Sequence, residues 1–202
     1  MNVRRLGIFG GAFDPVHNAH LTIAQAALDQ KALDEVLFVP SGEPVRKPHG
    51  TLASADARLE MLHLAIAGRK EFAVSTLETG RPGPSYTVDT LEELAMRTGP
   101  DTALILLCGE DAAADLPTWQ GATRIAQLAT VLVAPRLGAH RGGAGFQPAN
   151  SAFMMAVLHL PENPLSSSSV RTALATGRSV EGQLPAAVLT YIQSRGLYAK
   201  LS

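Results

Sequence analysis

The stretch that decides the fold is GIFGGAFDPVHNAHL, residues 7–21. An apolar run ends here, Gly10 and Gly11 turn the chain, and a helical pattern follows directly. Glycines at the carboxyl end of a strand let the backbone approach a ligand closely. His17 and His20 stand at the mouth and in the first turn of the helix, where unpaired N–H groups and the helix dipole favour an anion. This pattern predicts a strand–turn–helix unit with an anion site at the turn.

The same alternation continues along the chain. Nearly continuous apolar runs, typical of strands covered on both faces, lie at residues 4–9, 35–40, 72–77, 103–108, 130–135 and 153–160. Helical patterns occupy residues 19–33, 54–67 and 87–99, a serine-rich turn opens another at 165–177, and a last one begins near Pro185. Strand–helix repetition predicts an α/β fold, a doubly wound, Rossmann-like, mostly parallel sheet with helices on both faces, in one domain over residues 1–202.

Composition and charge limit the partners. The 202 residues are 46% hydrophobic and 17% charged, and the formal net charge is −1. Without a basic field, we expect no nucleic-acid partner, and a bound phosphate must be held by a few local cations. No run approaches the ~18 apolar residues that a membrane span needs, so no membrane partner is expected. A homo-oligomer is compatible with the sequence.

Cys108 is the single cysteine of the chain. One cysteine excludes an internal disulfide and is typical of a reducing compartment, so a cytoplasmic location is expected. Cys108 lies in the apolar run ALILLC (103–108), which favours a buried structural thiol over a reactive one.

Three interpretations of the two histidines compete on the residues alone. A zinc site is disfavoured, because the pair lacks the i, i+4 spacing of H-E-x-x-H and no partner cysteines or histidines are evident. The dinucleotide fingerprint G-x-G-x-x-G does not fit either, since glycines stand at 7, 10 and 11 with none later in the turn. A plain helix start with incidental histidines stays open at this point.

A family resemblance extends over almost the whole chain. GGAFDPVHNAHL (10–21) resembles the nucleotidylyltransferase signature, in which H-x-G-H follows a G-x-F-D-P turn. Further segments are similar, in order, to those of bacterial nicotinate-nucleotide adenylyltransferases: PSGEPVRKPHG (40–50) with ASADARLEML (53–62), RPGPSYTVDTLEEL (81–94), CGEDAAADLPTWQ (108–120), APRLG (134–138), LSSSSVRTAL (165–174) and AVLTYIQSRGLY (187–198). The resemblance implies transfer of AMP from ATP to nicotinate mononucleotide, giving deamido-NAD and pyrophosphate.

The resemblance also implies site residues, position by position. The catalytic group would be His17, His20, Lys47 and Arg171. ATP would be bound by Gly10, Gly11, Ala12, Phe13, Gly109, Asp111, Ser167 and Ser168, and the acceptor by Thr87, Trp119 and Arg136. Mg2+ would arrive with ATP, and no protein metal site is expected. Asp14 is interpreted as holding its own turn through Asx-type hydrogen bonds.

Four departures from the family pattern leave alternatives open. Ala19 stands where the histidine motif has glycine, Ser168 where threonine is usual, Leu137 where proline follows arginine, and Thr76 where aspartate is common. The first could weaken ATP binding, which keeps a catalytically silent nucleotide-binding module as an alternative. The others bear on details of the acceptor site. Nicotinamide mononucleotide or phosphopantetheine is an alternative acceptor, although the chain length, SYTVDTL (85–91) and Trp119 argue against phosphopantetheine.

Overall fold

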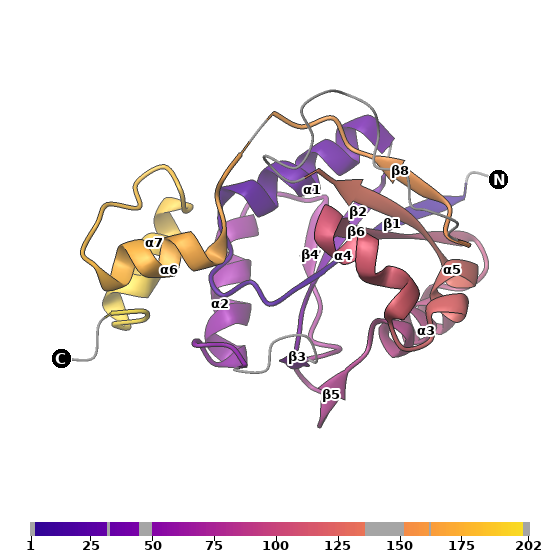
Figure 1. The fold of residues 1–202 in the computed structure, drawn as a ribbon, viewed down its shortest axis with the longest axis horizontal. Coiled ribbons are helices and arrows are strands. Elements are labelled where there is room, and N and C mark those ends of the chain that lie inside the picture. Colours follow the sequence, from indigo (N-terminus) through magenta and orange to yellow (C-terminus); the bar gives the residue numbers. More distant parts are fainter. Residues whose placement is uncertain (1–2, 32, 45–49, 136–151, 162, 200–202) are drawn as a thin grey trace.

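A single twisted sheet organises the protein (Figure 1). The structure is a computed structural model that describes residues 3–31, 33–44, 50–135, 152–161 and 163–199. The strands lie in the order β4-β2-β1-β6-β7-β8, and every neighbouring pair is parallel. Their bounds are β1 Arg4–Gly11, β2 Glu35–Pro40, β4 Phe72–Val74, β6 Thr102–Gly109, β7 Ala129–Ala134 and β8 Met155–Val157. The predicted doubly wound α/β fold is confirmed.

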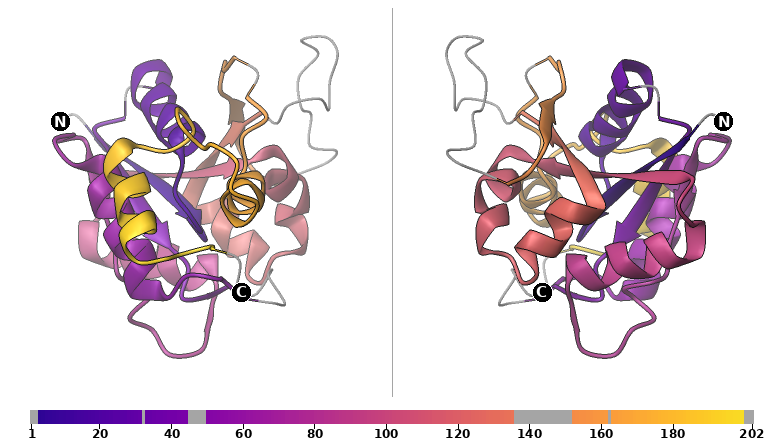
Figure 2. Two further views of the ribbon diagram at one scale, coloured as in Figure 1. Left: turned by 90° about the vertical axis from the view of Figure 1, so that its left-hand side faces the viewer. Right: turned by 90° about the vertical axis from the view of Figure 1, so that its right-hand side faces the viewer.

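Helices cover both faces of this sheet, as the two side views show (Figure 2). On one face, α1 Asn18–Lys31 and α2 Ala55–Ile66 pack on the sheet, and α6 Ser167–Ala175 and α7 Ala186–Ser194 extend the same core, with α7 against α2. The other packs against α3 Thr87–Thr98, α4 Glu110–Asp115, a 3-10 helix Leu116–Thr118 and α5 Ala122–Leu128. Within β1, Ile8 belongs to the second core and Phe9 to the first. The nearly continuous apolar pattern of this strand therefore reflects burial on both sides.

The order of the strands places a switch point between β1 and β6. From β1 the chain moves outward to β2 and β4, then returns to β6 on the other side of β1 and continues to β7 and β8. In such sheets the crevice beyond the carboxyl ends of the two central strands is the usual ligand site. Gly10 and Gly11 end β1 and Gly109 ends β6, so the glycines of the sequence motif and of the CGED segment meet at this crevice.

Local signals in the sequence account for the helix ends. The Oγ of Ser54 accepts a hydrogen bond from the N–H of Ala57 and caps α2. Gly99 ends α3 with a positive φ of 76°, which a glycine adopts without strain. The helical patterns therefore predicted both boundaries closely.

Some elements differ from the expectation. The edge strands β4 and β8 are only three residues long and are shorter than the predicted runs at 72–77 and 153–160. The helices between β6 and β7 were not predicted, since six or seven residues are too few to show a helical period. A two-stranded parallel pair, β3 Glu43–Pro44 and β5 Pro84–Ser85, was also unpredicted. The expected loop at 136–150 lies outside the described residues.

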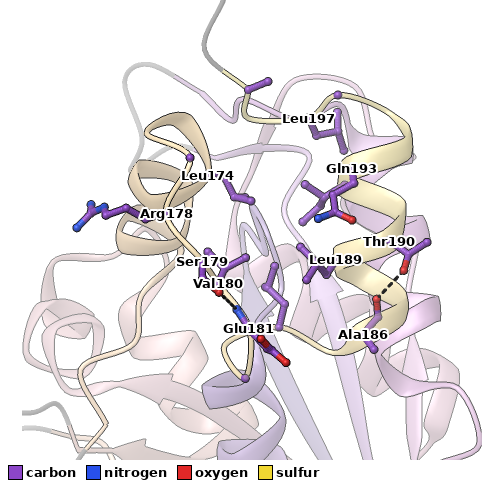
Figure 3. A pocket seen from close by; sticks show the side chains of 16 residues that line it. Leu174, Arg178, Ser179, Val180, Glu181, Ala186, Leu189, Thr190, Gln193 and Leu197 are labelled. Carbon is purple, nitrogen blue, oxygen red and sulfur yellow. Dashed lines mark hydrogen bonds between the residues drawn. The ribbon is translucent and has the colours of Figure 1, made fainter.

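An open hollow of about 790 Å3 lies between the end of α6, the loop that follows it and α7 (Figure 3). Leu174, Val180, Leu189 and Leu197 contribute its apolar lining. All of its lining residues belong to the segment 174–199, so this hollow is separate from the crevice at the strand ends.

Among the described residues, no helix is both long and apolar enough to cross a membrane.

Cys108 gives a chemical test of the packing of β6. The side chain is buried, as predicted, and burial raises the pKa of its thiol from 9.0 to about 12. Because only the thiolate reacts, and its fraction falls about 1000-fold with this shift, we expect the native protein at pH 8 to react with a thiol reagent orders of magnitude more slowly than the urea-unfolded chain. Cys108→Ser is the blank. Rapid stoichiometric labelling of the native protein would contradict the burial.

Candidate active site

A cavity of about 460 Å3 lies beyond the carboxyl ends of the central strands. Its volume is in the range of small-molecule sites. Six of the predicted site residues line it: Gly10, Gly11, Ala12, Thr87, Gly109 and Trp119. Residues from β1, from the start of α3 and from the end of β6 onward, far apart in the sequence, thus converge on one pocket.

Several polar residues of this cavity were not predicted. The carboxyl of Glu78 is buried in the wall, where the Oγ1 of Thr90 donates to its Oε1 over 2.8 Å. Burial raises the pKa of Glu78, and the hydrogen bond from Thr90 and the charge of Arg81 act in the opposite direction. Gly42 lies against this segment, because a Cβ there would come within 2.2 Å of the carbonyl oxygen of Glu78. No local pattern in the sequence marks Glu78 or Gly42, since their contact joins two loops that are far apart in the sequence.

His17 and His20 form a stacked pair where α1 begins. Their ring centroids are 3.7 Å apart, and the N–H of His17 donates to the Nδ1 of His20 over 3.1 Å. Since that Nδ1 accepts, a neutral His20 carries its proton on Nε2. Burial lowers the pKa of His17 to about 4, so this ring is neutral at pH 7. His17 is therefore a hydrogen-bonding group that carries no permanent positive charge.

Two phenylalanine rings pack against the ring of His20. The ring of His20 lies 5.0 Å from that of Phe13 and 5.9 Å from that of Phe9. Phe13 itself is buried and has a positive φ of 48°. Its ring belongs to the core, so only the main chain of Phe13 is available for the ATP-binding role expected of it.

Asp14 does not hold its own turn, so that interpretation is wrong. Its carboxylate is only 2% exposed and accepts hydrogen bonds from distant groups. The main-chain N–H groups of Leu52 and Ala53 donate to Oδ2 and Oδ1 over 2.9 and 3.0 Å. The hydroxyl of Tyr198 donates to Oδ1 over 2.7 Å. A buried carboxylate needs such donors, and here they come from the loop before α2 and from the C-terminal segment.

The start of α6 docks onto the same turn, a contact that was not predicted. The Oγ of Ser167 donates to the carbonyl of Pro15 over 3.0 Å. Arg171 donates through Nη1 to the carbonyl of Asp14 over 2.7 Å and through Nη2 to the Oγ of Ser168 over 3.2 Å. Three predicted phosphate-binding residues thus lie against the β1–α1 turn.

Arg58 is a further unpredicted member of this arrangement. It is 1% exposed, and its Nη1 donates to the carbonyl of Ala12 over 2.9 Å. Burial lowers the pKa of Arg58, while the nearby Asp14 and Tyr198 act to raise it. The signal was present in the sequence, because Arg58 shares the buried face of α2 with Met61 and Leu62. A cation on an apolar helical face indicates a buried polar contact.

The remaining predicted residues are not gathered into the cavity. Asp111 is exposed in the first turn of α4 and is not among the lining residues. The histidine pair, the two serines and Arg171 lie outside the lining and connect to it through residues 12–15. Lys47 and Arg136 lie outside the described residues.

Comparisons with known proteins agree with this arrangement. The cytidylyltransferase-like family model matches residues 8–173. A protein named probable nicotinate-nucleotide adenylyltransferase from Synechococcus sp. (strain JA-3-3Ab) is 43% identical, over 96% of this chain and 95% of its own. One of the same name from Thermus thermophilus is 42% identical, over 96% and 99% of the two chains.

Solved structures share the fold at lower identity. The Plasmodium falciparum nicotinic acid mononucleotide adenylyltransferase complexed with NaAD superposes with a TM-score of 0.78 at 17% identity, covering 96% of this chain and 97% of that one. Motif order, sheet topology and close relatives over the full length lead to one assignment: the chain belongs to the cytidylyltransferase-like family and, within it, to the nicotinate-nucleotide adenylyltransferases.

Proposed function

We propose that this protein transfers the adenylyl group of ATP to nicotinate mononucleotide, forming deamido-NAD and pyrophosphate in NAD biosynthesis. The observation that carries the proposal is the placing of the stacked histidine pair at the mouth of α1, next to a small-molecule cavity at the switch point of the sheet. The names of relatives at about 40% identity support the choice of acceptor. A cytoplasmic location stays a prediction.

The reaction needs positioning more than chemistry from the protein. A phosphate oxygen of the acceptor attacks the α-phosphorus of ATP, a new P–O bond forms, and the bond to the β-phosphate breaks to release pyrophosphate. Such a transfer is accelerated by holding the reactants in line and by stabilising charge on the phosphoryl oxygens. His17 and His20 supply N–H donors at α1, where the helix dipole adds to the same effect. Mg2+ enters with ATP as part of that substrate.

The β- and γ-phosphates of ATP, which are released as pyrophosphate, are negatively charged and require cations and hydrogen-bond donors. Arg171 is held at the β1–α1 turn with a guanidinium that is still partly exposed. We assign it, with Ser167, Ser168 and Lys47, to the β- and γ-phosphates. The main chain of residues 10–13 lies at the carboxyl end of β1, and we assign it to the same triphosphate. Gly109 and Asp111 follow β6, where we place the ribose.

We assign the acceptor to the cavity. Trp119 and Thr87 line it, and we assign the indole to stacking on the pyridine ring and Thr87 to the carboxylate. The ring of a pyridine nucleotide is cationic, which strengthens stacking on an indole face. Arg136 is assigned to the acceptor phosphate.

Pyrophosphate release tests the proposal directly. With ATP and Mg2+, we expect turnover with nicotinate mononucleotide and little with nicotinamide mononucleotide or phosphopantetheine. His20→Ala should lower kcat about 100-fold, because a donor to the reacting phosphate is lost. His159→Ala is the matched control, since His159 is exposed and bonds to Gln30 through its main chain.

The outcomes separate the alternatives. Preference for another acceptor would keep the reaction class and overturn the substrate. ATP binding without any turnover would favour the silent module, and Ala19→Gly would then be the variant to examine. Ala19 is buried in the first turn of α1, so its methyl group packs inside the protein.

Trp119 provides an optical test of the acceptor site. It is the only tryptophan of the chain, so its fluorescence reports on this position alone. We expect nicotinate mononucleotide to quench it by stacking, and Trp119→Ala to raise KM for the acceptor roughly tenfold. Trp119→Phe should retain most of the affinity. An unchanged KM in Trp119→Ala would place the pyridine ring elsewhere.

The neutral state of His17 gives a pH prediction. The unfolded chain binds this proton near pH 6.5 and the folded protein only near pH 4, so acid favours the unfolded state. We expect up to about 3 kcal/mol of the free energy of unfolding to be lost as the pH falls from 6.5 to 4. Urea titrations should show a flatter pH dependence for His17→Gln over this interval. His63→Gln, at an exposed position of α2, should match the wild type. Equal slopes in His17→Gln and the wild type would contradict burial of a neutral ring.

A further inference from the structure

Tyr198 reaches back from the C-terminal segment to the β1–α1 turn. Its hydroxyl lies 2.7 Å from the Oδ1 of Asp14, 184 positions earlier in the chain. Tyr198 directly follows Leu197, which lines the hollow beside α7 in Figure 3. The residue adopts a left-handed φ of 61°, which is unusual for a tyrosine. A left-handed backbone is costly for a tyrosine and is kept only where surrounding contacts hold it, and the hydrogen bond to Asp14 is one such contact.

The carboxylate of Asp14 lies between competing donors. Tyr198 and two main-chain N–H groups satisfy it through hydrogen bonds. The Nη1 of Arg171 lies 3.9 Å from Oδ2, beyond hydrogen-bond distance, and donates to the main-chain carbonyl of Asp14 instead. Arg58 approaches from α2 and is held on the carbonyl of Ala12. Two guanidinium groups therefore stand beside one buried carboxylate, and neither donates a hydrogen bond to it.

We propose that Tyr198 is a positioning residue for Arg171. By occupying Oδ1, its hydroxyl keeps the carboxylate satisfied, so that Arg171 stays on the main-chain carbonyl with its remaining N–H groups available to the ATP phosphates. Without the hydroxyl, the under-satisfied carboxylate draws the guanidinium of Arg171 into a direct ion pair, away from the phosphates. This inference rests on the assignment of Arg171 to ATP in the proposed function.

The chemistry of the phenol fits this role. Burial, together with the adjacent carboxylate, raises the pKa of Tyr198 well above its usual range, whereas Arg171 and Arg58 act in the opposite direction. The hydroxyl is therefore protonated at physiological pH and acts as a donor. An alternative is that Tyr198 only fastens the C-terminal segment. A fastening contact alone would lower thermal stability without a selective loss of ATP affinity.

Binding of a non-hydrolysable ATP analogue with Mg2+ distinguishes the two roles. We expect Tyr198→Phe to weaken this binding about tenfold in calorimetry, because one charged contact to the phosphates is lost. KM for nicotinate mononucleotide should stay within about twofold. Tyr191→Phe is the matched control, since Tyr191 lies half-buried on α7 and the change also removes one hydroxyl. All titrations are run at a temperature at which circular dichroism shows each variant folded.

A double-mutant cycle provides the decisive comparison. In an Arg171→Ala background, Tyr198→Phe should change the affinity for the analogue by less than about twofold, because its effect acts through Arg171. Equal losses in both backgrounds, or unchanged affinity in Tyr198→Phe, would overturn the inference. Turnover with a different acceptor would revise the substrate and leave the inference intact, since the analogue binds without acceptor. Failure of the wild type to bind the analogue would overturn both the inference and the proposed function.

Discussion

The buried carboxylate of Asp14 is the constraint on which the site depends. A carboxylate that is 2% exposed is unfavourable unless hydrogen-bond donors surround it. Here the donors come from the loop before α2 and from Tyr198, and α6 closes the arrangement through Arg171. The buried carboxylate thereby joins two parts of the chain to the β1–α1 turn, and the main-chain carbonyl of the same residue joins α6 to it. The turn leads directly into the two histidines at the start of α1.

The central part of the fold was predictable because its signals are local. β1, β2, β6 and β7 are buried on both faces, so their apolar runs are nearly continuous and match the observed strands within one or two residues. The edge strands were predicted too long, because an apolar run does not show where its pairing partner ends. Helices shorter than two turns, such as α4 and α5, carry no period that a sequence can display.

The site residues likewise fall into those that a local sequence signal predicts and those that depend on distant contacts. The glycines at 10, 11 and 109 and the two histidines are recognisable, because their meaning lies in a turn or at a helix start. Glu78 and Tyr198 were missed, since each acts through a contact with a segment far away in the sequence. Asp14 was misinterpreted for the same reason: a short polar side chain after a turn suggests local hydrogen bonds, and its real partners lie 38 to 184 positions away.

The contact between Tyr198 and Asp14 also determines when, during synthesis of the chain, the carboxylate gains its last hydrogen-bond donor. The β1–α1 turn is synthesised before the segments that contact it, which are the loop before α2, the start of α6 and Tyr198. The carboxylate receives its phenol donor only after residue 198 has left the ribosome. In a growing chain, the β1–α1 turn therefore waits for 184 further residues before Asp14 acquires its full set of native contacts.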